Sequence, residues 1–101
     1  MVIQTAEGKR SIDGIVVTVD GRPLSEHYEV ERFTKWGFEW TYEGASPQQL
    51  ALALLYDHTG DRARAIRLCE PFMKKVVANL DNDWTLNSQD IDHALEEIEG
   101  R

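Results

Sequence analysis

The sequence predicts an α+β domain. A small N-terminal antiparallel β-sheet is expected to pack on a buried central helix, with a kinked second helix and a C-terminal helix beside it. Two observations carry this prediction. Residues 15–19 are all β-branched, which favours a strand, and residues 50–55 are all leucine or alanine, which are among the strongest helix formers. A chain of 101 residues amounts to one domain. We expect residues 1–43 to form its β-rich part and residues 44–101 its helical part.

The β-rich part is expected to contain short strands joined by tight turns. Val2–Thr5 is a candidate first strand, and Glu7–Arg10 is turn-like. Ile15–Val19 is the clearest strand, and the Asp20-Gly21 pair directly after it is a strong signal for a two-residue hairpin turn. The returning strand must be brief, because Pro23 has no N–H to donate to a central ladder.

A clear alternating pattern lies at Trp36–Tyr42, which is predicted to be a further strand. Aromatic side chains at every second position would share one face of it: Trp36, Phe38, Trp40 and Tyr42. Such a ladder can stack nucleic-acid bases. It more often packs against a helix, and an apolar helix follows directly. Because the interleaved charge is Glu39 rather than a basic residue, the core interpretation is preferred.

Pro47–Thr59 is expected to form the central helix. Ser46 is suited to be its N-cap, because its hydroxyl can accept a hydrogen bond from the first turn, and Pro47 suits the first helical position. Gly60 suits the left-handed residue that ends a helix, and Asp61 can cap the next one. The run is apolar nearly all round, so other elements should surround it.

Two amphipathic helices are expected further along the chain. Asp61–Leu80 carries apolar residues at helical spacing, and Pro71 should kink it because proline removes one backbone hydrogen bond. Trp84–Leu86 is expected to be a short extended piece at the edge of the core. Asn87 or Ser88 should cap the last helix.

Three stretches of the chain carry a family resemblance. They are Trp36-Gly37-Phe38-Glu39-Trp40-x-Tyr42-x-Gly44, then Pro47-x-Gln49-Leu50-Ala51-Leu52-Ala53-Leu54-Leu55-x-Asp57, then Gly60-Asp61. In these stretches the chain resembles a family of small domains of unknown function found in archaea, bacteria and their phages. The resemblance implies a common fold and a prokaryotic or phage origin. It implies no catalytic residue, because the matching positions are mostly glycine, aromatic and aliphatic.

Recognisable catalytic motifs are missing from the sequence. There is no glycine-rich phosphate loop, no Cys or His ligand set and no nucleophile elbow. His27, His58 and His93 are scattered, and Cys69 lies on the apolar stripe of the second helix, where it is expected to be a core residue. Asp57 and Asp61 flank His58 and could be taken as a metal or acid–base cluster, but helix-end solvation and an N-cap are the preferred interpretation. We therefore expect no enzymatic activity, no cofactor and no metal.

Charge is distributed unevenly along the chain, and the acidic C-terminal part suggests the preferred hypothesis for function. The net charge of −7 disfavours general affinity for nucleic acid or anionic membranes. Residues 81–101 carry seven acidic side chains and one basic side chain. The candidate protein-binding residues are the acidic ones of the last helix: Asp90, Asp92, Glu96, Glu97 and Glu99. We expect a non-enzymatic protein-binding module, regulatory or inhibitory. In its narrower version, a phage or mobile-element protein blocks a nucleic-acid-binding host complex by charge mimicry.

Two alternative hypotheses remain open at this point. One is nucleic-acid binding through basic residues of the second helix: Arg62, Arg64, Arg67, Lys74 and Lys75. A solvated helix face is the simpler explanation for them. The other is an enzyme with an unrecognised site among the acidic residues and histidines. The single cysteine and the lack of a leader-like start indicate a cytoplasmic location without a membrane partner, and monomer and homodimer are both compatible with the sequence.

Overall fold

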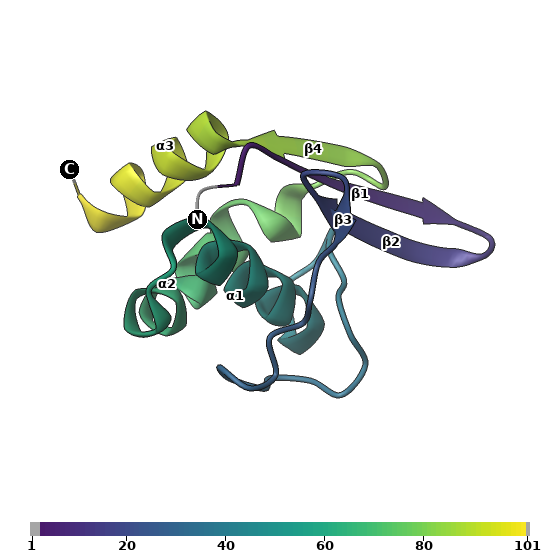
Figure 1. Cartoon of the computed structure of the whole chain (residues 1–101), viewed down its shortest axis with the longest axis horizontal. Coiled ribbons are helices and arrows are strands. Elements are labelled where there is room, and N and C mark those ends of the chain that lie inside the picture. The colour runs from purple at the N-terminus through teal and green to yellow at the C-terminus, as the bar shows by residue number, and fades with distance from the viewer. Residues whose placement is uncertain (1–2, 101) are drawn as a thin grey trace.

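A computed structural model describes residues 3–100 of the chain, and it confirms the α+β fold. The elements are β1 (Thr5–Ser11), β2 (Gly14–Val19), β3 (Arg22–Pro23), α1 (Ala45–Thr59), α2 (Arg62–Lys75), the 3₁₀ helix η1 (Val77–Asn79), β4 (Trp84–Asn87) and α3 (Ser88–Glu99). The sheet lies over α1 and α2, and the β1–β2 hairpin extends past the helices at the end opposite α3 (Figure 1). No helix within residues 3–100 is long and apolar enough to cross a membrane.

The four strands form one antiparallel sheet in the order β3-β2-β1-β4. Strand β1 pairs with β2 along its length, but with β4 only as far as Gly8, which lies opposite Trp84. Strand β3 is two residues long and pairs only with Thr18 and Val19 of β2. The predicted Ile15–Val19 strand, its hairpin turn and the brief return are therefore confirmed. Among residues 3–100, no strand lies beside the outer half of the β1–β2 hairpin.

The expectation of a turn at Glu7–Arg10 is wrong, because these residues lie within β1. The first strand begins at Thr5 rather than ending there, and Val2 lies outside the described residues. Gly8 has a packing role instead of a turn role. A Cβ atom on Gly8 would lie 2.2 Å from Nε1 of Trp84, so the missing side chain leaves room for the indole ring across the strand pair.

The predicted strand at Trp36–Tyr42 is also wrong: the segment is an irregular loop. Gly37 and Thr41 both have φ of 81°, in the left-handed region, so the chain leaves the extended conformation twice and alternation is lost. The four aromatic side chains are accordingly divided: Phe38 and Trp40 are buried in the core, whereas Trp36 and Tyr42 are exposed.

Helix α1 is the buried centre of the molecule, as predicted. Every residue from Leu50 to Leu55 is buried, and Gly60 closes the helix in the left-handed conformation with φ of 67°. The N-cap prediction is wrong, since Gly44 occupies that position and Ser46 lies in the first turn. The Ser46 hydroxyl is buried and donates to Oγ1 of Thr34, 3.0 Å away, which ties the preceding loop to the helix.

A second buried side chain of α1, Gln49, holds the same loop more firmly. Its Oε1 accepts the N–H of Phe33 at 2.8 Å, and its Nε2 donates to the carbonyl oxygens of Glu26 and Glu31 at 2.7 and 3.0 Å. The loop has few backbone partners of its own, so this one amide satisfies groups that would otherwise be costly to bury. Gln49 thereby fixes the start of the segment that carries the exposed aromatics.

The two later helices follow their sequence signals closely. The Asp61 side chain caps α2 by accepting the N–H of Arg64, and Pro71 lies inside the kinked helix, whose α-helical part ends at Lys75 before η1. The Asn87 side chain caps α3 in a reciprocal capping box with Asp90.

Candidate binding cleft

Large apolar side chains are exposed at one end of the molecule, around the β1–β2 hairpin and the loop that faces it. Ile12 at the hairpin tip is fully exposed, Val16 is 60% exposed, Trp36 is 78% exposed and Tyr42 is 49% exposed. The rest of the large apolar residues described are buried or half-buried. Single exposed apolar residues are ordinary, but a cluster of them at one place indicates an interaction site.

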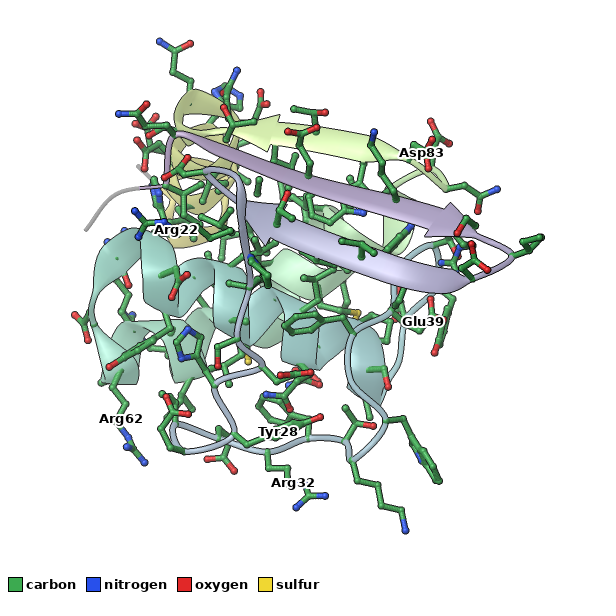
Figure 2. The ribbon with its side chains drawn as sticks, turned by 45° about the vertical axis from the view of Figure 1, so that its right-hand side comes forward. Arg22, Tyr28, Arg32, Glu39, Arg62 and Asp83 are labelled. Atoms are coloured by element: carbon green, nitrogen blue, oxygen red, sulfur yellow. The ribbon has the colours of Figure 1, made fainter. Side chains whose placement is uncertain are left out.

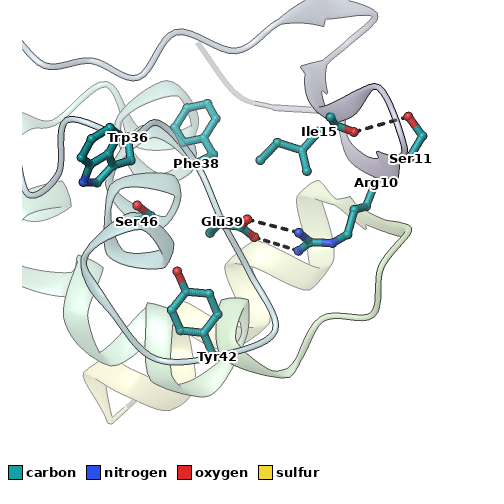
Figure 3. A pocket seen from close by; sticks show the side chains of 9 residues that line it. Arg10, Ser11, Ile15, Trp36, Phe38, Glu39, Tyr42 and Ser46 are labelled. Atoms are coloured by element: carbon teal, nitrogen blue, oxygen red, sulfur yellow. Dashed lines mark hydrogen bonds and ion pairs between the residues drawn. The ribbon is translucent and has the colours of Figure 1, made fainter.

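A cleft of about 650 Å³ separates the hairpin from the loop, and we call it the hairpin cleft (Figure 3). This volume is within the range of about 300–1,000 Å³ that is common for ligand sites. Its walls combine two elements far apart in sequence. The hairpin contributes Arg10, Gly14 and Ile15 to these walls, and the loop contributes Trp36, Phe38, Glu39 and Tyr42.

An ion pair spans the inner part of the hairpin cleft. Nη1 and Nη2 of Arg10 donate to the two carboxylate oxygens of Glu39 at 3.2 and 2.8 Å, and the guanidinium lies 4.8 Å from the ring centre of Trp40. The hydrogen bonds from Arg10 hold the pKa of the Glu39 carboxyl below its ordinary value, despite partial burial, and the same contact raises the pKa of Arg10. The two charges neutralise each other, so the cleft presents no net charge.

The acidic residues proposed for protein binding are mostly engaged within the molecule. Asp90 belongs to the capping box, and Oδ1 of Asp92 lies 2.6 Å from Nε2 of His58. Glu97 lies 3.5 Å from Nζ of Lys75, and Glu99 lies 2.6 Å from Nη2 of Arg64. These carboxylates therefore have structural partners on α1 and α2 or within α3 itself.

Most of the basic residues proposed for nucleic-acid binding form ion pairs with these acidic residues of α3. Arg64, Arg67 and Lys75 face α3 and pair with Glu99 or Glu97. Arg62 instead donates to the carbonyl oxygen of Glu29 at 3.5 Å. Much of the basic charge of α2 is thus balanced by α3 rather than gathered on one open face.

The Asp57, His58 and Asp61 cluster considered from the sequence is not assembled. Asp57 contacts His27, and Asp61 caps α2. His58 is buried, and its Nδ1 accepts the N–H of Ile3 at 3.3 Å, so the proton on Nε2 is donated to Asp92. Both nitrogens of the His58 ring have protein partners, which gives it a structural role between α1, α3 and the start of the chain.

His27 is likewise held from both sides. Its Nδ1 lies 3.0 Å from Oε2 of Glu29 and its Nε2 lies 2.6 Å from Oδ1 of Asp57, while Tyr56 packs edge-on against the ring. The hydrogen bond to His27 holds the pKa of Glu29 below its ordinary value. Within residues 3–100, no group of three or more Cys, His, Asp or Glu side chains is arranged to hold a metal ion.

Cys69 is buried on the apolar side of α2, as its spacing suggested. Burial raises the pKa of its thiol, although a contact from Nε2 of Gln48 at 3.6 Å opposes the effect. A protonated, buried thiol is a poor nucleophile.

Sequence reasoning missed the hairpin cleft because it assigned all four aromatic residues of the loop to one strand. A signal was present at Gly37, since glycine inside an otherwise regular strand pattern often marks a break in it. The overhang of the hairpin had no comparable local signal, because it depends on where β3 and β4 stop.

The fold and the cleft together define a small α+β domain with exposed aromatic side chains at a cleft beside a protruding hairpin. A family model described as DUF6166, a family of unknown function, matches residues 6–97. The chain belongs to this family, in line with the resemblance to a family of unknown function. Comparisons with curated proteins and with solved structures give no match.

Proposed function

We propose that this chain is a small non-enzymatic protein-binding module with a regulatory or inhibitory role, and that it contacts its partner through the hairpin cleft. The observation that carries the proposal is the exposure of Trp36 and Tyr42, which both line the hairpin cleft. Aromatic residues are enriched at protein interfaces and supply a large share of their binding energy. The cleft that Trp36 and Tyr42 line gives an anchoring side chain a place to enter.

The acidic helix is given a supporting role in this proposal. Its carboxylates already serve His58, Lys75, Arg64 and the α3 N-terminus. Because these carboxylates are already paired, they contribute to the overall electrostatic field of the protein more than to specific contacts with a partner. The net charge of −7 would speed association with a basic partner. A phage or other prokaryotic inhibitor that blocks a nucleic-acid-binding host complex is the narrower form of the proposal, and charge mimicry is its most specific version.

The proposal is tested by affinity capture from a prokaryotic lysate, with and without nuclease, using the wild type and Trp36→Ser/Tyr42→Ser. We expect a protein partner that survives nuclease, is enriched by the wild type and is lost with the double variant. Glu96→Gln/Lys74→Gln changes two exposed residues on the helices and should retain it. A partner captured equally by all three proteins would refute the assignment to the cleft.

The nuclease arm also addresses the alternative on α2. Recovery of nucleic acid alone, lost on nuclease treatment and reduced by Arg62→Gln/Lys74→Gln, would favour the basic helix instead. Arg62 and Lys74 are chosen because the ion pairs described between α2 and α3 involve other basic residues, namely Arg64, Arg67 and Lys75. Replacing Arg62 and Lys74 therefore leaves those ion pairs intact.

A further inference from the structure

The outer edge of β2 is open beside the hairpin cleft. The N–H of Leu24 donates to the carbonyl of Val17 at 3.0 Å, so the backbone groups of Val17 face the side of β3. Backbone direction alternates along a strand, and therefore the N–H and C=O of Ile15 face the same side. Pairing with β3 stops at Thr18, and within residues 3–100 no described hydrogen bond engages the backbone of Ile15.

The other edge of the hairpin is closed at the same level. Strand β4 ends its pairing opposite Gly8, and the carboxylate of Asp83 then accepts the next outward N–H, that of Arg10, at 3.2 Å. Asp83 and Glu39 lie on opposite sides of the hairpin in Figure 2, with Glu39 on the cleft side. One edge is thus covered by a side chain, while the other keeps the unpaired groups that another strand can join.

The open edge and the cleft form one continuous site. Gly14 and Ile15 border the cleft on the hairpin side, and Trp36, Phe38 and Tyr42 border it on the loop side (Figure 3). A segment that is extended along β2 would direct alternate side chains into this space and the others towards solvent. Main-chain hydrogen bonds would give affinity, and the aromatic pocket would select the inward residues.

Charge narrows the chemistry of the occupant. Arg10 and Glu39 neutralise each other inside the cleft, so the inward residues of the segment should be uncharged. The chain as a whole carries −7, and residues flanking the segment should therefore be basic.

We propose that the hairpin cleft takes an extended, uncharged segment of a basic protein partner, which adds to β2 at Ile15 as a further strand of the sheet. This inference rests on the proposed protein-binding function and deepens it. Two hydrogen bonds, one donated by the N–H of Ile15 and one accepted by its C=O, define the register. The inward side chains of the segment contact Trp36 and Phe38.

The probe is a displayed library of randomised nine-residue peptides, selected on the wild-type protein at low ionic strength. The selected sequences should alternate β-branched or aromatic residues with polar ones and carry lysine or arginine at their ends. Affinity should fall as salt rises. Proline-rich or helix-patterned sequences would overturn strand addition. A selection without enriched peptides would count against both this inference and the proposed function.

The strand contact itself is tested on the best selected peptide. N-methylation of the backbone nitrogen facing Ile15 removes one donor from the peptide and should weaken binding about tenfold, whereas N-methylation one residue away should matter less. In the protein, Ile15→Pro removes the outward N–H and should have a similar effect, with Val16→Thr as the control. The peptide arm needs no change to the protein, so it decides the question even where Ile15→Pro does not fold.

Trp36→Ala separates this inference from the proposed function. Loss of binding with Trp36→Ala and with N-methylated peptide supports strand addition in the cleft. Loss with Trp36→Ala alone, with the N-methylated peptide and Ile15→Pro within twofold of the parent affinity, would keep protein binding and refute strand addition. Equal binding by all variants would refute both.

Discussion

At the helical end of the molecule, charged groups are paired across elements and helix ends are capped. Glu99 meets Arg64, Asp92 meets His58, and Asn87 forms a capping box with Asp90. At the hairpin end, Trp36 and other large apolar side chains are exposed, and one strand edge is unpaired. At the helical end, charged and helix-terminal groups are paired within the molecule. At the hairpin end, apolar side chains and backbone hydrogen-bonding groups are available to another molecule. This difference is why we place binding at the hairpin end, although the helical end holds more charge.

The largest expected effect comes from comparing one aromatic truncation at each end. Phe72→Ala removes a fully buried ring of α2 and should lower the free energy of unfolding by about 3–5 kcal/mol. Trp36→Ala removes an exposed ring and should change it by only about 0.5 kcal/mol. Urea unfolding followed by circular dichroism measures both. A cost of several kcal/mol for Trp36→Ala would mean that its ring supports the fold, and the case for a binding surface would weaken.

The second prediction concerns the connection between the two ends. Gln49→Leu replaces the amide by an apolar side chain of similar size and leaves the N–H of Phe33 and the carbonyl oxygens of Glu26 and Glu31 without their partner. We expect a loss of about 1–3 kcal/mol or more, because buried polar groups are costly when unpaired. Hydrogen exchange should also increase across residues 26–42.

The neighbouring residue supplies a matched control. Gln48→Leu makes the same chemical change one position earlier, where the one side-chain hydrogen bond described is to Sγ of Cys69. It should cost clearly less and leave exchange in the loop unaltered. Equal effects of the two substitutions would show that Gln49 does not hold the loop.

The third prediction tests the packing of the sheet where the hairpin leaves the core. Gly8→Ala places a Cβ atom 2.2 Å from Nε1 of Trp84, and the indole ring has to move. Overpacking of this kind typically costs about 1–3 kcal/mol. The cost should be smaller in a Trp84→Leu background, as a double-mutant cycle on unfolding free energies would measure. Additive costs would show that Trp84 is not the reason for glycine at this position.

Gly8 also illustrates which features could be read from the sequence. The helix ends at Gly60, Asp61 and Asn87 were predictable because a cap acts through residues within one turn of itself. The hairpin turn at Asp20-Gly21 was predictable for the same reason. Gly8 was mistaken for a turn residue, because its partner Trp84 is far away in sequence and only the strand pairing brings them together.

The binding cleft was missed for a related reason. The alternating aromatics of residues 36–42 satisfy the pattern of a strand, yet Gln49 and Ser46 hold the residues just before them, Phe33 and Thr34, against α1, and within residues 3–100 the segment pairs with no strand. The sequence shows which residues of α2 and α3 are charged but not which of them form ion pairs, since the contact between the two helices depends on how they pack. The sequence shows where the charges lie along the chain, and only the fold shows that many of them form ion pairs within the molecule.

The smallest expected effect is at the ion pair inside the hairpin cleft. Glu39→Gln removes one partner of Arg10 and should lower stability at pH 7 by about 0–1 kcal/mol, because both side chains keep about 30% of their exposure and water screens the pair. The folded-state pKa of Glu39 lies below its ordinary value, so the stabilisation is present above that ordinary value and is lost as pH falls through the lowered pKa. Urea unfolding between pH 7 and pH 3 should therefore show the difference between wild type and Glu39→Gln shrinking towards zero in acid.

Glu43→Gln is the matched control, since it makes the same change at an exposed residue of the same loop for which no ion pair is described. Its difference from the wild type should stay small and nearly constant over this range. A Glu39→Gln effect that did not decrease at all between pH 7 and pH 3 would mean that the side chain acts through packing or through its contact with the Trp40 N–H rather than through charge. In that case the cleft would lack the neutralised pair from which we inferred an uncharged occupant, and the expected chemistry of the inward residues would have to change.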